Sequence, residues 1–352
     1  MIDTNVMRRL ADGMFVPIVH RELGDAGAAA LRDVLSFLPR LYSVLSPEQI
    51  TGTLYVLRFL TPQQASPVLS GCSPVEVPLD RLPRGVAQTT VIEVLDKEVA
   101  RVWENAAIDV ALASTIAVVY RYRGDEGFVV RDRYCAIPNP AVEHLSVFAR
   151  PTFSSLLEAL QDYRARLVRT STCHLFRMAW ETEQRVFFAS GPEHHMRRSL
   201  CQFLYSRLRD VNVLPEQRVD ETHPVDLKVT WSFTLSEALI EIKWLGKSRN
   251  GTSIVEYWDA RAREGAKQLV DYLDWYRTTN PNADTKGYLV VVDGRRRSLS
   301  ATTTSVSQAD GMYYEHREIE YNPRYEELRS DFAPPLRLFA EPKWTADAGA
   351  GS

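Results

Sequence analysis

Two segments in the second half of the chain alternate apolar and polar residues. In residues 225–233, VDLKVTWSF, each odd-numbered residue is apolar and each even-numbered residue is polar. Residues 238–245, ALIEIKWL, contain a second alternating run in which Glu241 and Lys243 occupy the polar row. Because successive side chains of a strand point to opposite faces, both segments are predicted to be strands with one buried and one polar face.

The segments around these strands show other spacings. Residues 193–208 and 260–276 each carry apolar residues at intervals of three and four, which is typical of an amphipathic helix. Residues 153–168 follow the same spacing. Residues 287–293, GYLVVVD, form a continuous apolar run that predicts a buried strand. The second half is therefore predicted to combine helices and strands in one domain.

The first half of the chain predicts another mixture of helices and strands, with no recognisable catalytic set. Helices are expected at residues 28–38 and 97–107, and a strand is expected at residues 51–60. Residues 115–123 and 128–134 flank the turn sequence GDEG, which predicts a hairpin. The role of this half is not indicated by any motif.

The length of 352 residues suits two domains. Prolines interrupt the pattern ahead of Pro151, and the boundary is predicted there. We expect an N-terminal α/β domain at residues 1–150, with a role in regulation, oligomerisation or recognition of a target. A second domain is expected at residues 151–345, followed by a disordered Ala-Gly-Ser tail at residues 346–352.

Composition and charge restrict the possible partners. With 45% hydrophobic and 25% charged residues, the chain is typical of a globular protein. A net charge of −3 gives no general attraction for nucleic acid, so such binding must use a local patch or a metal ion. The most apolar stretch, residues 106–120, contains Asp109 and is shorter than the roughly 20 residues of a membrane span. Without a visible signal peptide, and with four scattered cysteines, the sequence predicts a cytoplasmic protein that has free thiols and no membrane partner.

Candidate chemistry appears where the two alternating strands meet. Paired as a hairpin, they would bring Asp226 close to Glu241. Two carboxylates and a backbone carbonyl are suitable ligands for Mg²⁺ or Mn²⁺, and such an ion neutralises phosphate charge and activates a water molecule. Lys243 lies on the same face as Glu241 and could orient that water or stabilise developing charge.

The same residues resemble a known motif. Pro224-Val225-Asp226, followed after a gap by Glu241-Ile242-Lys243, resembles the PD-(D/E)xK signature of restriction-endonuclease-like nucleases. One departure is that Val225 separates the proline from the aspartate. The resemblance implies a mixed α/β (α+β) fold with an αβββαβ core, in which one strand is not placed from the sequence. It also implies a metal held by Asp226, Glu241 and the Ile242 backbone carbonyl, with Lys243 acting on the attacking water.

Two helices extend the resemblance. Gln268 and Tyr272 share a helix face and resemble the QxxxY motif of the RecB-like branch, which implies that they support the substrate. Glu193 lies at the start of the upstream helix. Members of the family often carry a glutamate on this helix that reaches the metal through water, and Glu193 resembles it by position. Other interpretations remain open, because Ser190 and Glu193 also fit a capping box. Gln268 and Tyr272 also fit a solvated face beside a core tyrosine.

Several charged residues have an ordinary structural interpretation. The D…ExK pattern alone also fits an exposed sheet face, where charges serve solubility. Residues 295–297, three consecutive arginines, fit either a phosphate-contacting patch or a solvated turn. His194, His195 and His223 are not required by the resemblance and are given no role.

The resemblance implies a metal-dependent nuclease with Mg²⁺ or Mn²⁺ as cofactor, acting on the phosphodiester bonds of nucleic acid, with DNA favoured. A nuclease domain joined to a second domain is similar in architecture to bacterial anti-phage effectors and restriction subunits, which would add a partner protein or a homo-oligomer. Two alternatives stay open. The same site could cleave RNA, or the chain could be a catalytically silent module that binds nucleic acid or protein.

Overall fold

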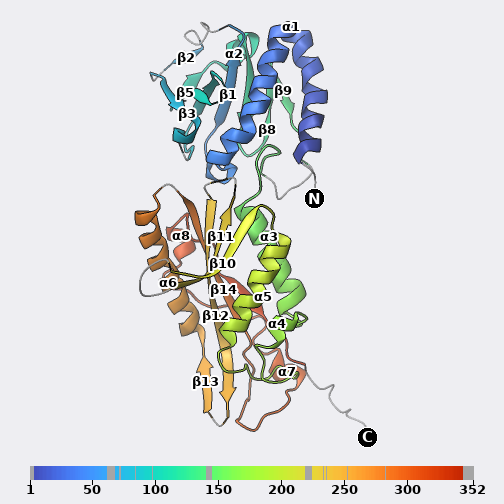
Figure 1. Cartoon of the computed structure of the whole chain (residues 1–352), viewed down its shortest axis with the longest axis vertical. Helices are drawn as coiled ribbons and strands as arrows, with labels where there is room; N and C mark the ends of the chain where they lie inside the picture. Colours follow the sequence, from blue (N-terminus) through green and yellow to red (C-terminus); the bar gives the residue numbers. More distant parts are fainter. Residues whose placement is uncertain are drawn as a thin grey trace. The chain divides into compact units, whose positions relative to one another are not determined.

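The chain divides into two compact units, Met1–Pro151 and Thr152–Ser352 (Figure 1). The computed structural model describes residues 4–61, 68–70, 73–83, 85–96, 98–139, 145–218, 224–232, 234, 236–251, 253–281 and 283–343. Helices and strands are mixed in both units. Cys72, His223 and the expected tail at residues 346–352 lie outside the described residues.

A seven-stranded sheet forms the centre of the first unit, in the order β3-β5-β4-β1-β7-β8-β9. Neighbouring strands are antiparallel, except that β1 and β4 are parallel. The strands are β1 (Leu54–Phe59), β3 (Val75–Pro78), β4 (Thr90–Val94), β5 (Val99–Glu104), β7 (Ala117–Tyr122), β8 (Glu126–Val130) and β9 (Arg133–Ala136). The short strands β2 (Leu69–Ser70) and β6 (Ala107–Ile108) pair separately.

Helices cover this sheet and bury its two faces. The long helix α1 (Thr4–Val44) packs on one face and changes direction at Gly24, whose φ of 67° is left-handed. The short helix α2 (Val110–Ile116) belongs to the apolar cluster on the other face. Single 3₁₀ turns, η1 (Pro47–Gln49) and η2 (Leu79–Arg81), lie in the connections.

The strand predicted at residues 51–60 and the hairpin predicted at 115–134 are confirmed by β1, β7 and β8. The helix predicted at residues 97–107 is wrong, because β5 occupies this segment between β3 and β4. Val102 packs into the cluster that contains α1, and the adjacent Trp103 packs into the cluster on the opposite face. Pairing on both edges and burial of β-branched and aromatic side chains therefore outweigh the weak helical spacing.

A second sheet forms the centre of the other unit, in the order β10-β11-β12-β14-β15. Strand β13 pairs with the C-terminal part of β12. Its strands are β10 (Val211–Arg218), β11 (Pro224–Trp231), β12 (Ser236–Asn250), β13 (Ser253–Tyr257), β14 (Asp284–Asp293) and β15 (Leu336–Phe339). Its helices are α3 (Phe153–Tyr163) with the π-helical turn η3 (Arg164–Val168), α4 (His174–Arg177), α5 (Pro192–Arg207), α6 (Asp259–Thr279), α7 (Gln308–Gly311) and α8 (Tyr325–Leu328). Pairing is antiparallel from β10 to β12 and parallel from β12 to β15.

Both faces of the second sheet are covered. Figure 1 shows α3 and α5 on one side of β11, β12 and β14, and α6 on the other. On the first side, Leu200 of α5 and Ile242 of β12 belong to one apolar cluster. On the second side, Leu269 of α6 packs with Leu239 and Leu289. The polar rows of β11 and β12 are therefore covered in part, with Asp226, Glu241 and Lys243 buried and Lys228 and Thr230 partly buried.

The alternation correctly predicts β11 and β12 as strands, and the helical spacing correctly predicts α3, α5 and α6. The alternative interpretation of an exposed sheet face is wrong, because Asp226, Glu241 and Lys243 are only 8%, 2% and 4% exposed. Helix α6 is the physical reason, since it lies along that face of β12. The strands β10 and β13, which the sequence pattern did not reveal, complete the sheet.

Core packing of α5 generates a first prediction. Leu200 is 1% exposed, so Leu200→Ala would leave a cavity and lower the free energy of unfolding by about 2–5 kcal/mol. Tyr205→Ala is the matched control on the same helix, since Tyr205 is 66% exposed and its truncation should change the value by less than about 0.5 kcal/mol. Urea unfolding followed by circular dichroism measures both, and equal effects would contradict the placement of α5.

Candidate carboxylate site

The site begins where strands β11 and β12 stop pairing. Their register runs from Thr230 opposite Glu237 to Leu227 opposite Ile240, and one further step would place Asp226 opposite Glu241. At that step the Asp226 carboxylate replaces a backbone partner, because its Oδ2 accepts the Ile242 N–H at 2.8 Å. The side chain of Asp226 thus satisfies a strand amide at the point where the ladder ends.

Arg197 holds the other oxygen of Asp226. This arginine comes from α5, and its Nη1 donates to Asp226 Oδ1 at 2.8 Å. It also bonds to Glu216 of β10, where a positive φ of 50° interrupts the regular strand. Sequence reasoning did not identify Arg197, although its position one helical turn after Glu193 puts both residues on one face of α5.

Glu241 and Lys243 lie side by side in the enclosed row of β12. The Lys243 ammonium donates to Glu241 Oε1, while Glu241 Oε2 is buried and has no hydrogen-bond partner. Gly265 of α6 makes room for this lysine, since a Cβ there would lie 2.5 Å from Lys243 Cγ. The absence of a side chain at Gly265 therefore allows α6 to approach β12 over the lysine.

Glu193 joins the same group from the start of α5. Its Oε1 lies 3.8 Å from Lys243 Nζ, so its carboxylate faces the enclosed row of β12. The capping box considered for Ser190 is not formed, because Gly191 is the N-cap and makes no side-chain cap bond. Glu193 is thus directed to the carboxylates and not to its own helix end.

Burial and the repulsion between neighbouring carboxylates raise the pKa values of the acids in this site. Burial raises the pKa of Glu241 to about 8, and the neighbouring Asp226 charge acts in the same sense, while Lys243 opposes both. Burial also raises the pKa of Glu193, again with a contribution from Asp226, against the attraction of Lys243, Arg261 and Arg197. Burial and the nearby Asp226 carboxylate thus disfavour the ionised forms of Glu241 and Glu193 more than the neighbouring cations favour them.

A divalent cation would offset the repulsion between these buried carboxylates. The donor set fits an ion of the Mg²⁺ type, because Glu241 Oε2 is a buried oxygen without a partner and Asp226 lies next in the ladder opposite Glu241. The other oxygens are engaged, since Arg197 pairs with Asp226 Oδ1, Lys243 pairs with Glu241 Oε1, and the Ile242 amide donates to Asp226 Oδ2. Among the described residues, no group of three or more His, Cys, Asp and Glu side chains is already gathered closely enough to hold a metal. Binding would therefore require the cations to withdraw.

Gln268 and Tyr272 lie one turn apart on α6, as their spacing requires. The Gln268 amide donates to the Tyr272 hydroxyl, and that hydroxyl lies 3.4 Å from the Pro224 carbonyl oxygen. Tyr272 is buried and packs with Val225 in the cluster under α6. The pair thus contacts the first residues of β11, two positions before Asp226.

Two of the three arginines at residues 295–297 are buried and therefore belong neither to a solvated turn nor to an exposed phosphate patch. Arg295 and Arg296 are each 4% exposed. Arg295 donates to Asp293 and, at 2.5 Å, to Asp259, so it ties the end of β14 to the start of α6. Only Arg297 of the three is substantially exposed, and it pairs with Asp310 at 2.6 Å.

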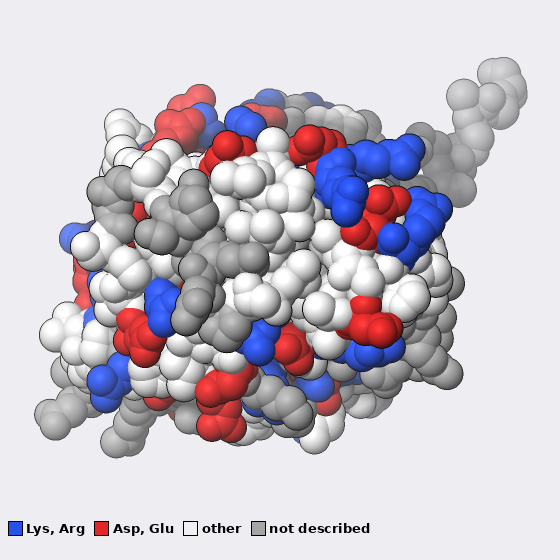
Figure 2. All heavy atoms as spheres, turned by 90° about the horizontal axis from the view of Figure 1, so that it is seen from above, with Lys and Arg blue, Asp and Glu red and all other residues white. Residues whose placement is uncertain are grey.

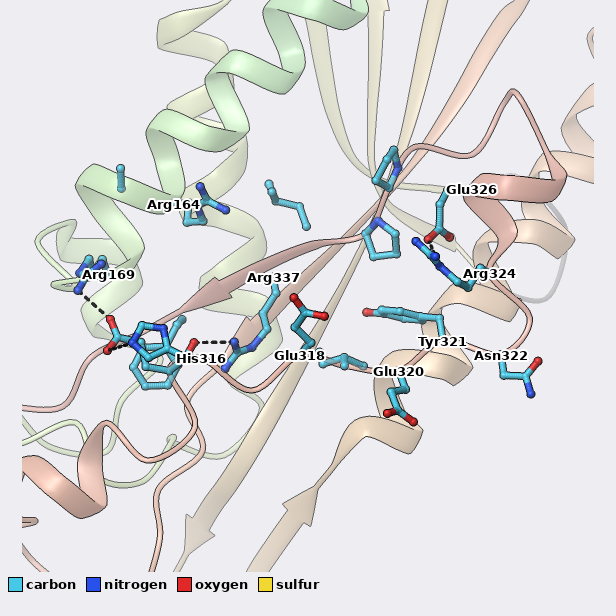
Figure 3. A pocket seen from close by; sticks show the side chains of 17 residues that line it. Arg164, Arg169, His316, Glu318, Glu320, Tyr321, Asn322, Arg324, Glu326 and Arg337 are labelled. Atoms are coloured by element: carbon cyan, nitrogen blue, oxygen red, sulfur yellow. Dashed lines mark hydrogen bonds and ion pairs between the residues drawn. The ribbon is translucent and has the colours of Figure 1, made fainter.

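A separate pocket lies beside β15 (Figure 3). Its lining comes from η3, from residues 315–326 and from residues 334–339, and the predicted site residues do not contribute to it. Its charges largely satisfy one another, with Arg169 2.9 Å from Glu315 and Arg324 3.1 Å from Glu326. We assign no function to this pocket.

Figure 2 views the molecule from the top of Figure 1. Over the described residues drawn in colour, acidic and basic side chains are scattered among uncharged ones. No helix in the described part of the chain is both long and apolar enough to cross a membrane.

Comparisons with protein-family models, with curated proteins and with solved structures each gave no match.

The raised pKa of Glu241 predicts a specific dependence of stability on pH. Because the folded-state pKa, about 8, lies above the ordinary value of 4.5, the stabilisation is complete below 4.5 and is lost as pH rises through about 8. Glu241→Gln mimics the protonated acid at every pH. Its free energy of unfolding relative to wild type should therefore rise between about pH 5 and about pH 9, by on the order of a few kcal/mol. Urea unfolding in chelator measures this difference, and a constant difference would contradict the burial of an uncompensated carboxyl.

Proposed function

We propose that the second unit is a Mg²⁺- or Mn²⁺-dependent nuclease that hydrolyses phosphodiester bonds, with DNA as the favoured substrate. The observation that supports this most strongly is the meeting of Asp226 and Glu241 at the end of the β11–β12 ladder, with Lys243 beside them. These are the residues through which the sequence resembles the PD-(D/E)xK nucleases.

The order of elements supports the same proposal. From α5 the chain continues through β10, β11 and β12, then through α6 to β14. This order is similar to the αβββαβ core that the resemblance implies, and in the proposal β10 would be the strand that the sequence pattern left unplaced. The hairpin strand β13 extends β12 before α6 begins.

The chain's own residues suggest how the reaction would proceed. A bound Mg²⁺ would neutralise phosphate charge and lower the pKa of its water. Asp226, Glu241 and the Ile242 carbonyl would hold the ion, and Glu193 would contact it through water. Lys243, once released from Glu241, would orient the attacking water or stabilise charge on the phosphate. Gln268 would support the substrate, whereas buried Tyr272 would keep the start of β11 in place.

A silent binding module is the second candidate, and a different observation favours it. Arg197 and Lys243 already occupy oxygens of Asp226 and Glu241, and both ion pairs are largely buried. Breaking buried pairs is costly unless another charge replaces the cation. In such a module these pairs would be permanent, and the unit would bind nucleic acid or protein without cleaving it.

The first unit would then recognise a target, regulate the nuclease or join copies of the chain. A defence effector or a restriction subunit combines a nuclease with such a module, and this suggestion rests on the architecture alone. A partner protein would bind through the first unit.

Cleavage assays separate the two candidates. Plasmid, linear duplex, single-stranded DNA and RNA would be incubated with Mg²⁺, Mn²⁺ or a chelator. We expect metal-dependent cleavage that Asp226→Asn and Glu241→Gln reduce by at least about 10³-fold, since each removes a charged ligand. Glu237→Gln is the matched control, because Glu237 lies on the same strand and pairs with Lys228 and Tyr276. Metal-independent activity, or full activity in both site variants, would refute the proposed mechanism.

The close approach of α6 gives a second test of the same mechanism. Gly265→Ala should displace Lys243, because the new Cβ would lie 2.5 Å from its Cγ. A displacement of this size in a reacting group can lower turnover by about 10²-fold while metal affinity is retained. Asp271→Ala is the control for increased helix propensity, since Asp271 is exposed on the same helix. Equal turnover of Gly265→Ala and wild type would remove Lys243 from the mechanism.

A further inference from the structure

Aromatic side chains gather at the N-terminal end of α6. Trp258 immediately precedes this helix, and its ring centroid lies 5.8 Å from that of Tyr314 in an edge-on contact. Tyr314 in turn lies 5.0 Å from the neighbouring ring of Tyr313. Trp258 is 43% exposed and Tyr313 is 36% exposed, so this cluster is partly open to solvent.

Arginines line the same cluster. The Arg317 guanidinium lies 4.2 Å from the Tyr313 ring centroid and 5.4 Å from that of Tyr314. Arg297 lies 4.6 Å from the Tyr313 centroid. These five residues, Trp258, Tyr313, Tyr314, Arg297 and Arg317, are called the aromatic–arginine surface below. Cation–π contacts place its guanidinium groups beside the rings.

Contacts of two arginines, Arg295 and Arg337, hold the aromatic–arginine surface in place. Arg295 lies 4.9 Å from the Tyr314 centroid and bonds to both Asp293 and Asp259. Arg337 of β15 also donates to the backbone carbonyl of Tyr314. The rings are therefore positioned by the ends of β14, β15 and α6, and a flat ligand would meet a preformed surface.

Helix α6 links this surface to the carboxylates. Gly265 of α6 lies against Lys243, and Trp258 lies seven residues earlier. At 1.5 Å per residue the separation along the helix is about 10 Å. Arg261 stands on the intervening turn, with its guanidinium 5.0 Å from the Tyr257 ring and its charge acting on Glu193. About 10 Å corresponds to roughly three stacked nucleotides of one strand.

We propose that the aromatic–arginine surface binds unpaired nucleotides and leads a single strand, past Arg261, to the carboxylates. This inference rests on the proposed nuclease function and specifies its substrate as single-stranded nucleic acid at the site. Aromatic rings and guanidinium planes stack with any base, and arginines beside them attract the backbone phosphates. Bases in a duplex are already stacked on one another, so an intact duplex does not offer the faces that this surface recognises.

Binding can be measured without cleavage. A fluorescein-labelled strand of mixed sequence would be titrated with the full chain in chelator, alone and annealed to its complement, with fluorescence anisotropy as the readout. We expect tighter binding of the single strand. Trp258→Ala should weaken it about tenfold, because stacking on one ring is lost, and Trp258→Phe should retain most of the affinity.

A matched control lies on the same helix. Trp275 is 41% exposed on α6, and Trp275→Ala should leave binding unchanged. Arg317→Ala should weaken binding and also reduce the slope of log affinity against log salt concentration by about 0.7, the value for one phosphate contact with a single strand. Circular dichroism confirms that each variant is folded. Equal losses in Trp258→Ala and Trp275→Ala, preference for the duplex, or no binding of any oligonucleotide by the wild type would each overturn the proposal.

The same titration distinguishes this proposal from the proposed catalysis. Glu237→Gln should bind the single strand as well as the wild type does, because Glu237 pairs with Lys228 and Tyr276 and belongs neither to the surface nor to the candidate site. If binding depends on Trp258 but metal-dependent cleavage is never observed, the surface is supported and the nuclease is not. If cleavage depends on Glu241 and is the same for Trp258→Ala and the wild type, the nuclease is supported and the surface is refuted.

Discussion

The interaction on which the second unit depends is the hydrogen bond from the Ile242 amide to the Asp226 carboxylate, at 2.8 Å. Strands β11 and β12 separate at this point, and without Asp226 the amide would be a buried donor lacking a partner. The same bond fixes Asp226 opposite Glu241. Arg197 then anchors the second oxygen, so one aspartate connects β11, β12 and α5. A structural requirement of the sheet thereby brings together the charges of the candidate site.

The enclosure of these charges shifts their protonation. Helix α6 covers the row that contains Glu241 and Lys243, and its approach is possible because position 265 is a glycine. Burial raises the pKa of Glu241 and of Glu193, and each cation nearby offsets only part of the cost. A divalent ion would remove the repulsion between the carboxylates. In this structure Arg197 and Lys243 pair with these carboxylates, and in the proposed metal-bound state the ion would take over that role.

Local periodicity was sufficient to predict β11, β12, α5 and α6, because each segment has a repeating apolar pattern. It failed for β5, where pairing on both edges decided the conformation, and it did not reveal β10 or β13. The proximity of Asp226 and Glu241 could be predicted from the pairing of the two strands as a hairpin. Their burial could not be predicted from the sequence, because it depends on how α6 packs. The roles of Arg197, Gly265 and Arg295 arise from contacts between distant segments, and no spacing in the sequence encodes those contacts.

A crystal grown with Mn²⁺ would show whether these carboxylates form a metal site, because anomalous scattering locates the ion without reference to activity. We expect one strong anomalous peak between the carboxylates of Asp226 and Glu241, within about 2.0–2.6 Å of their oxygens. We also expect Lys243 to have moved away from Glu241 Oε1. Retention of both ion pairs, with no anomalous density at these oxygens, would contradict the metal site and favour the silent binding module.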